Sequence, residues 1–179
     1  MAIIFPQPLI DAAQNRQLVL FVGAGLSCVN GLPNWSGLAY RALQQLAKTQ
    51  KISYSELSLL GTYPPRTQVS IAQIIAGGSQ QKIDYKDALK GEVKSKLHDS
   101  LWQISRRFVT TNYDSLIEAN FRPFNDGNGK TIAMPTSLNN PPAFSEENLS
   151  TEGSVFHIHG SLENEDDMVL STWNYLTHY

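Results

Sequence analysis

"LVLFVGAGLSCVNGLPNW", residues 18–35, opens with five apolar residues and continues through glycines to a proline and a tryptophan. The apolar run 18–22 lacks alternation, which predicts a strand buried on both faces, as in a parallel sheet. Glycines after such a strand allow a tight turn and bring backbone N–H groups close to a pyrophosphate. Because the spacing is not the full G-x-G-x-x-G, this stretch alone fits either a nucleotide-binding turn or an ordinary strand-to-loop turn.

Strands and helices alternate along the rest of the chain, with a long helical stretch after the first strand. This pattern predicts an α/β fold, a Rossmann-like doubly wound parallel sheet, with a helical subdomain inserted over residues 36–104. Ser36 is the expected N-cap of the first helix of that insertion. We predict helices over residues 8–17, 36–48, 67–76, 85–104 and 115–120, strands over 18–22, 108–111 and within 154–164, a loop over 122–150 with a short strand near 131–134, and a short strand from residue 168 followed by a helix.

Composition narrows the class of protein. The chain of 179 residues is 41% hydrophobic and 17% charged, as in folded globular proteins, and its formal net charge of −2 gives no basis for binding nucleic acid or an anionic membrane. We find no signal peptide and no apolar segment near the roughly 20 residues that span a bilayer. Cys28 is the one cysteine, which excludes an intrachain disulfide and a multi-cysteine zinc site. We therefore predict a cytoplasmic protein.

The second motif is "TTNYD", residues 110–114, at the predicted carboxyl end of a strand. Ligands bind at that edge of open α/β sheets. The Asn112 amide offers a donor and an acceptor, suited to a water or a ribose hydroxyl, and Asp114 offers a carboxylate. The competing interpretation is that Asn112 and Asp114 only cap the helix that follows.

The third motif is "HIHGS", residues 157–161. On a strand, residues two apart share a face, so His157 and His159 should point the same way while Phe156 and Ile158 face the core. A histidine at a strand end, before a glycine, is well placed as a general base near neutral pH. A solvated or core-satisfied pair, or a His-x-His metal site, are the alternatives, although a metal would need further ligands.

Taken together, the three motifs resemble the sirtuin family of NAD-consuming enzymes. The resemblance implies a sirtuin-like NAD-binding domain over residues 1–179, with Asn112 beside the nicotinamide ribose and His159 as the catalytic histidine. Asp114 would lie near the carboxamide, and His157 is assigned provisionally to support His159. The resemblance implies these NAD-binding residues: Gly23, Ala24, Gly25, Ser27, Pro33, Trp35, Thr110, Asp114 and His157.

Departures from the family pattern refine this expectation. Protein-deacylating sirtuins carry four zinc-binding cysteines after the H-G motif and a "GIPDFR" segment, whereas here residues 31–36 read "GLPNWS". The chain instead looks like the bacterial sirtuin-like branch, whose members typically hydrolyse NAD as effectors in anti-phage defence. We thus expect an NAD hydrolase that forms nicotinamide and ADP-ribose and binds no metal, zinc included. The alternatives are an NAD-dependent deacylase, a non-catalytic NAD or ADP-ribose sensor, or a purely structural module.

Two expectations concern what lies beyond the chain itself. The family's later strands, with a further ribose-binding loop, should follow Tyr179, so the C-terminal part of the fold is expected to be missing and the domain incomplete. A free-running NADase would be toxic, so we expect gating through a homo-oligomer or a partner protein or domain.

Overall fold

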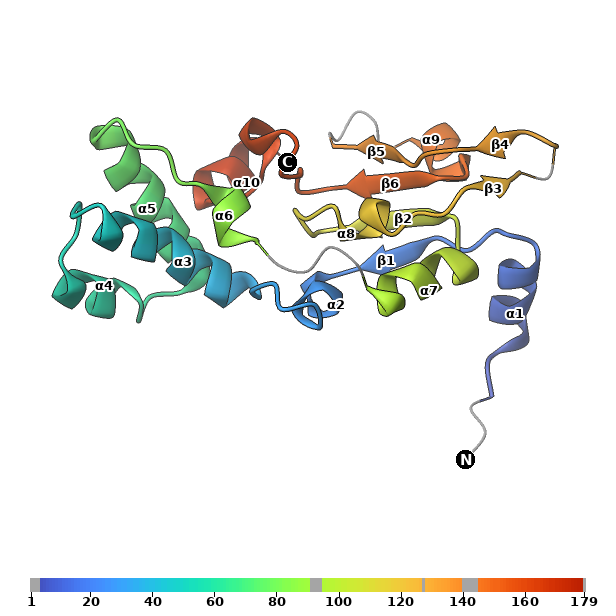
Figure 1. The fold of residues 1–179 in the computed structure, drawn as a ribbon, viewed down its shortest axis with the longest axis horizontal. Coiled ribbons are helices and arrows are strands. Elements are labelled where there is room, and N and C mark those ends of the chain that lie inside the picture. Colours follow the sequence, from blue (N-terminus) through green and yellow to red (C-terminus); the bar gives the residue numbers. More distant parts are fainter. Residues whose placement is uncertain (1–3, 91–94, 127, 140–144, 179) are drawn as a thin grey trace.

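A computed structural model describes residues 4–90, 95–126, 128–139 and 145–178. Its centre is a four-stranded parallel sheet in the order β1-β2-β6-β5 (Figure 1), with β1 at Leu20–Val22, β2 at Arg107–Thr110, β6 at Ser154–His157 and β5 at Thr136–Leu138. Parallel neighbours joined through helices confirm the predicted α/β class with a Rossmann-like sheet.

The register of the sheet brings the three motifs to one edge. Val22 pairs with Thr110, and Thr110 pairs in turn with His157, so the last residues of β1, β2 and β6 form one row. The segments that follow these residues therefore leave the sheet side by side, at the carboxyl edge where α/β proteins bind their ligands.

Four helices between β1 and β2 form a helical lobe at one end of the molecule (Figure 1). Its helices are α3 (Trp35–Lys48), α4 (Tyr54–Leu60), α5 (Pro65–Gly78) and α6 (Tyr85–Ala88). Helix α3 presents Leu38, Ala42, Leu43 and Leu46, each 2% exposed or less, to a core shared with α5. This apolar spacing of three and four residues is what makes α3 amphipathic.

A second core lies between the sheet and the helices α7 (Lys96–Ile104) and α8 (Leu116–Ala119). Trp102 stacks edge-on against Phe108 at a ring distance of 4.6 Å, and its indole nitrogen donates to the carbonyl of Ile117 at 2.8 Å. Helix α7 thus packs on the sheet and not with the helical lobe, although it falls within residues 36–104. The division of the chain into domains stays a prediction.

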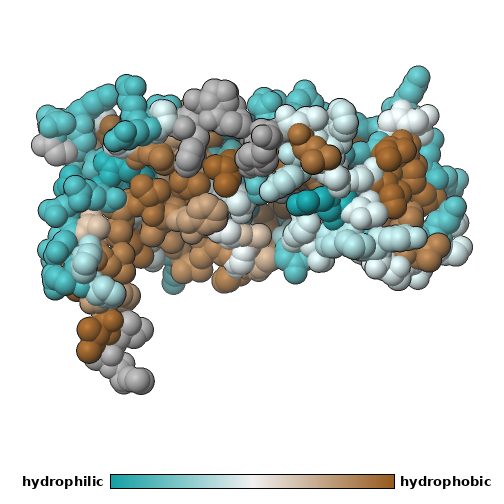
Figure 2. Space-filling view, turned by 180° about the vertical axis from the view of Figure 1, so that it is seen from behind, coloured by the Kyte–Doolittle hydropathy of each residue, from teal (hydrophilic) through white to brown (hydrophobic). Residues whose placement is uncertain are grey.

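The prediction that the first strand is buried on both faces is wrong. Strand β1 is at the edge of the sheet, and its Phe21 is 68% exposed. Figure 2 shows an apolar surface over the sheet half of the molecule, although Val109 and Phe156, which share the row of Phe21, are buried. An unbroken apolar run indicates that both faces are suited to burial, but the neighbouring elements decide whether burial occurs.

Several element boundaries differ from those predicted. The N-cap of α3 is Asn34, whose side chain accepts a hydrogen bond from the backbone N–H of Gly37 at 2.9 Å, and not Ser36. The predicted helix over residues 85–104 is two short helices, α6 and α7, and residues 91–94 between them lie outside the described residues. Helix α1 spans Gln7–Gln14 and α2 spans Ala24–Cys28.

The segment 122–150, predicted as a loop with a short strand near 131–134, contains that strand as β4 and further regular structure. Strands β3 (Phe124–Asn125) and β4 (Thr131–Ile132) form a small antiparallel hairpin, and α9 spans Glu146–Ser150. The fourth strand of the main sheet, β5, also comes from this segment, whereas residues 168–170 form no strand. A short 3₁₀ helix, Glu165–Asp167, and α10, Thr172–His178, complete the described chain. None of the described helices is long and apolar enough to span a membrane.

Candidate functional site

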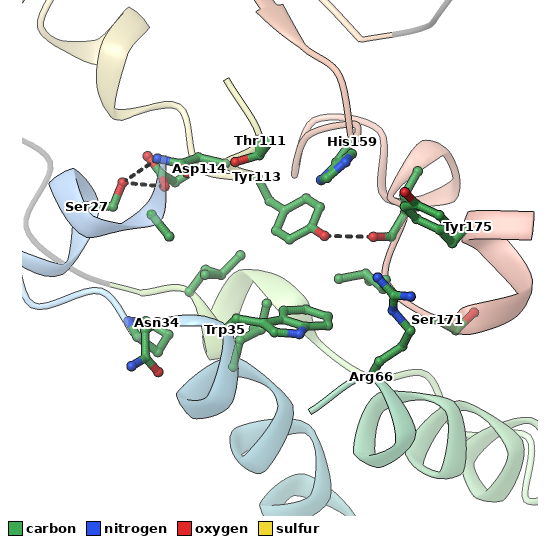
Figure 3. A pocket seen from close by; sticks show the side chains of 17 residues that line it. Ser27, Asn34, Trp35, Arg66, Thr111, Tyr113, Asp114, His159, Ser171 and Tyr175 are labelled. Atoms are coloured by element: carbon green, nitrogen blue, oxygen red, sulfur yellow. Dashed lines mark hydrogen bonds between the residues drawn. The ribbon is translucent and has the colours of Figure 1, made fainter. Parts of the chain in front are cut away.

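A pocket of about 260 Å³ lies between the carboxyl edge of the sheet and the helical lobe (Figure 3). It brings together side chains from β1–α2, β2–α8, the segment after β6, and helices α3, α5 and α10. Its lining residues are Ala24, Ser27, Pro33, Asn34, Trp35, Leu38, Arg66, Leu89, Thr111, Asn112, Tyr113, Asp114, His159, Val169, Leu170, Ser171 and Tyr175.

Ser27, Asn112 and Asp114 form a hydrogen-bonded chain at one end of the pocket. The Ser27 hydroxyl donates to Asp114 Oδ2 at 2.8 Å, and the Asn112 amide nitrogen donates to Ser27 Oγ at 2.9 Å. All three side chains are at most 8% exposed. The first and second motifs, 85 to 87 residues apart in sequence, are therefore joined directly in the folded protein.

The hydrogen bonds that link Asn112, Ser27 and Asp114 fix the orientation of the Asn112 amide. A carboxylate only accepts hydrogen bonds, so Ser27 must donate to Asp114 and accept from Asn112, which points the Asn112 nitrogen toward Ser27. Asn112 Oδ1 is then a buried acceptor, and it has no hydrogen-bond partner among the described residues. A buried unpaired acceptor is costly unless a ligand or water supplies a donor. Asn112 is therefore poised to accept from a hydroxyl group in the pocket.

Asp114 serves both interpretations that its sequence position allowed. Its Oδ1 accepts from the backbone N–H of Leu116 at 3.1 Å, at the first turn of α8, while Oδ2 accepts from Ser27. One oxygen therefore stabilises the start of α8, although the N-cap of this helix is Ser115 and not Asp114. The other oxygen holds the pocket residues together.

Thr110 does not line the pocket. It is 0% exposed, its hydroxyl donates to the carbonyl of Val22 at 2.9 Å, and the same oxygen accepts from the backbone N–H of Asn112 at 2.9 Å. Thr110 therefore ties β1 to the start of the Asn112 loop, and this geometry supports a structural role where we expected contact with NAD.

His157 also lies beneath the pocket and not in its lining. Its ring is 1% exposed; Nδ1 lies 2.8 Å from the carbonyl oxygen of Asn112 and Nε2 lies 2.7 Å from Glu118 Oε1 on α8. Burial works to lower the pKa of His157, but the hydrogen bond and charge of Glu118, with the Asn112 carbonyl, outweigh it and raise the pKa above its ordinary value. His157 thus holds the backbone of Asn112, and its expected support of His159 stays a prediction.

His159 reaches the pocket because β6 ends at His157. The chain turns there, with Gly160 N–H bonded to the His157 carbonyl at 3.1 Å, so the two histidines do not share a strand face as predicted. Gly160 has φ +78°, and a Cβ there would lie 2.4 Å from the carbonyl oxygen of Asp167. Only glycine fits this turn, which carries His159 to the pocket wall (Figure 3).

The glycine-rich turn borders a second hollow. Ala24 and Ser27 line the main pocket, whereas Gly23 and Gly25 line a separate hollow beside β1. A Cβ at Gly23 or Gly25 would meet no atom within 4 Å, so the backbone of this turn is open to an approaching group. Pro33 and Trp35, also expected to contact NAD, lie in the main pocket.

The polar side chains of the pocket that the sequence did not single out include Arg66, Tyr175, Ser171 and Tyr113. Arg66 on α5 and Tyr175 on α10 come from opposite sides, with the guanidinium carbon 4.7 Å from the ring centroid. Ser171 lies beside them, and the Tyr113 hydroxyl donates to the Val169 carbonyl at 2.8 Å. Tyr113 stood inside a recognised motif; the other three carry no local signal. Among the described residues, no cluster of three or more histidine, cysteine or acidic side chains could hold a metal ion.

The site combines an α/β sheet edge, a serine–asparagine–aspartate chain and a nearby histidine. Comparison with protein families agrees: residues 106–179 match the model of the SIR2-like domain, a family of NAD-dependent enzymes. The match includes "TTNYD" and "HIHGS", whereas the glycine turn after β1 lies outside it. Among curated proteins, no match was found.

Proposed function

We propose that this chain is an NAD hydrolase that releases nicotinamide and ADP-ribose. The observation that carries the proposal is the buried, unpartnered Oδ1 of Asn112, held in place by Ser27 and Asp114 in the same pocket as His159. Cleavage of the nicotinamide–ribose bond passes through an oxocarbenium-like state, which needs an oriented ribose and one water at the anomeric carbon. Asn112 supplies an acceptor for a ribose hydroxyl or for that water.

The other residues take complementary roles in this mechanism. His159 accepts a proton from the water, directly or through the ribose hydroxyls, an effect typically worth about 10²–10⁴ in rate. Asp114 accepts from Ser27 and so holds the Asn112 amide in one orientation. Asp114 itself lies near the nicotinamide carboxamide. The open backbone at Gly23–Gly25 receives the pyrophosphate.

A role as the effector of a bacterial anti-phage defence system fits this chemistry. Hydrolysis of NAD without an acceptor substrate depletes a coenzyme that the whole cell needs, so the activity must be held back until a signal arrives. We propose that oligomerisation or a partner protein supplies that control, in the cytoplasm. This part of the proposal rests on the resemblance to the bacterial sirtuin-like branch.

The direct test is release of nicotinamide from NAD by the purified full chain, measured by chromatography. We expect turnover by the wild type, and loss of at least about 100-fold in Asn112→Ala and His159→Ala. Asn128→Ala, an exposed asparagine in the β3–β4 turn, is the matched control and should keep full activity. Full activity in either site variant would overturn the assignment.

Two further outcomes separate the alternatives. Nicotinamide release that strictly requires an acyl-lysine peptide would identify a deacylase. Tight ADP-ribose binding in calorimetry, with no turnover of NAD under any condition, would identify a sensor.

A further inference from the structure

The pocket has a second polar end, formed by the helical lobe and α10. Arg66 projects from α5 into the pocket, on the side opposite Ser27 and Asp114 (Figure 3). Its guanidinium carbon lies 4.7 Å from the ring centroid of Tyr175. A guanidinium over an aromatic face is held flat while the N–H groups at its edge stay available.

The charge of Arg66 is not neutralised within the described part of the protein. None of the ion pairs of the described residues includes Arg66, and Asp114 is the one acidic residue in the pocket lining. Both oxygens of Asp114 already accept hydrogen bonds, from Ser27 and from Leu116, and Asp114 lies at the far end of the pocket. The Arg66 end of the pocket therefore presents a positive charge and fork-like donors without an internal acceptor.

From this arrangement we infer that Arg66 and Tyr175 form an oxyanion subsite, which binds a phosphate or carboxylate group of a ligand in the pocket. Guanidinium donors match the two oxygens of such groups in a bidentate geometry. Trp35, Leu38, Leu89 and Leu170 supply apolar walls to the pocket, whereas Arg66 and Tyr175 are themselves exposed, so an anion can reach them from solvent. The helical lobe thus contributes a recognition group to a site whose Ser27, Asn112, Asp114 and His159 come from the sheet edge.

The anion has two sources that share this chemistry. It is either a phosphate of the dinucleotide itself or the anionic group of a second, smaller molecule that enters from the lobe side. If the anion is a phosphate of NAD, the subsite rests on the proposed function. If the anion belongs to a second molecule, the subsite needs only the pocket and does not depend on NAD hydrolysis.

The experiment compares the full chain with Arg66→Ala and Arg66→Lys. Arg122→Ala removes the same charge from an exposed arginine outside the pocket and serves as the control. The probes are NAD and nicotinamide riboside in turnover assays, and ADP-ribose, inorganic phosphate and succinate in calorimetry. Circular dichroism checks that each variant is folded.

For a dinucleotide phosphate, Arg66→Ala should raise KM for NAD about 10- to 100-fold, with kcat nearly unchanged and nicotinamide riboside unaffected. Arg66→Lys should restore only part of the affinity, because lysine lacks the planar fork. For a second molecule, KM for NAD should stay the same while phosphate or succinate binds the wild type and not Arg66→Ala.

Two results would overturn the subsite: equal binding of every probe by wild type and Arg66→Ala, or an equal loss in Arg122→Ala. Failure of the proposed function looks different. In that case the wild type would not cleave NAD, while the calorimetric comparison of ADP-ribose, phosphate and succinate would still decide whether Arg66 binds an anion.

Discussion

His157 and Glu118 form a buried ion pair, with 2.7 Å between Nε2 and Oε1, directly beneath the backbone of Asn112. The pair connects β6 to α8 and leaves the other ring nitrogen of His157 on the Asn112 carbonyl. Protonation of one buried ring therefore stabilises both the fold and the loop that carries the central candidate residue.

This pair predicts a stability that falls at alkaline pH. Because the folded pKa of His157 is raised, its contribution is complete below the ordinary histidine pKa of about 6.5 and is lost as pH rises through the folded pKa. Glu118→Gln should remove this slope and cost about 1.5–3 kcal/mol at pH 6. Urea unfolding at pH 6 and pH 8.5 measures this cost and the change of stability with pH. The same change of stability between the two pH values in wild type and variant would contradict the ion pair.

His98 predicts the opposite dependence at acid pH. It is 0% exposed, neither ring nitrogen has a partner among the described residues, and burial lowers its pKa although the charge of Asp114 works to raise it. A lowered folded pKa gives stability that is present above about pH 6.5 and is lost as pH falls toward the folded pKa. In His98→Leu, the slope of the unfolding free energy against pH below about pH 6.5 should therefore be smaller, by up to about 1.4 kcal/mol per pH unit.

The measurement for His98 is chemical unfolding between pH 5 and pH 6.5, below the window in which His157 acts. Stability at pH 7.5 should change by no more than about 1–2 kcal/mol, because leucine replaces an unpaired polar group with an apolar one. If His98→Leu has the same pH dependence of unfolding free energy as the wild type between pH 5 and pH 6.5, other groups cause the loss of stability at acid pH.

Gly160→Ala should unfold the turn that presents His159. The alanine would adopt φ +78° and place its Cβ 2.4 Å from the Asp167 carbonyl, which combines backbone strain with a clash and should cost about 2–5 kcal/mol. Gly129→Ala is the matched control, because Gly129 has φ +83° with nothing within 4 Å of the added Cβ, so its cost should be about 1–2 kcal/mol. Equal melting temperatures for the two variants would contradict the clash.

The sheet edge could be predicted from the sequence because its signals are local. Each of the three motifs follows a short apolar run, and parallel strands place their carboxyl ends together, so Ser27, Asn112 and His159 were expected in one place. The turn after His157 was harder to foresee, since strand alternation holds only where the strand continues. His157 and His159 consequently have different surroundings.

The other half of the pocket could not be predicted in this way. Arg66 is 39 residues from Ser27 and lies on an ordinary-looking helix; only the packing of α5 against α3 brings it to the sheet edge. The exposure of Phe21 and the pairing of β5 likewise depend on which elements meet, and no periodicity encodes that. Contacts between elements far apart in the sequence therefore determine the position of Arg66, the exposure of Phe21 and the pairing of β5, which local sequence patterns do not predict.

Ser27→Ala tests whether the hydrogen-bonded chain orients Asn112. The substitution leaves Asn112 Nδ2 without its 2.9 Å acceptor and Asp114 Oδ2 without its 2.8 Å donor. The Asn112 amide can then rotate out of the orientation in which its Oδ1 is available to accept from a ligand. We expect kcat/KM for NAD to fall about 100-fold, as for a misplaced catalytic group, and stability to fall by about 1–3 kcal/mol. Ser100→Ala, an exposed serine on α7, is the matched control and should leave both unchanged. Wild-type turnover by a folded Ser27→Ala protein would mean that Asn112 needs no such support, and the proposed mechanism would lose its main structural argument.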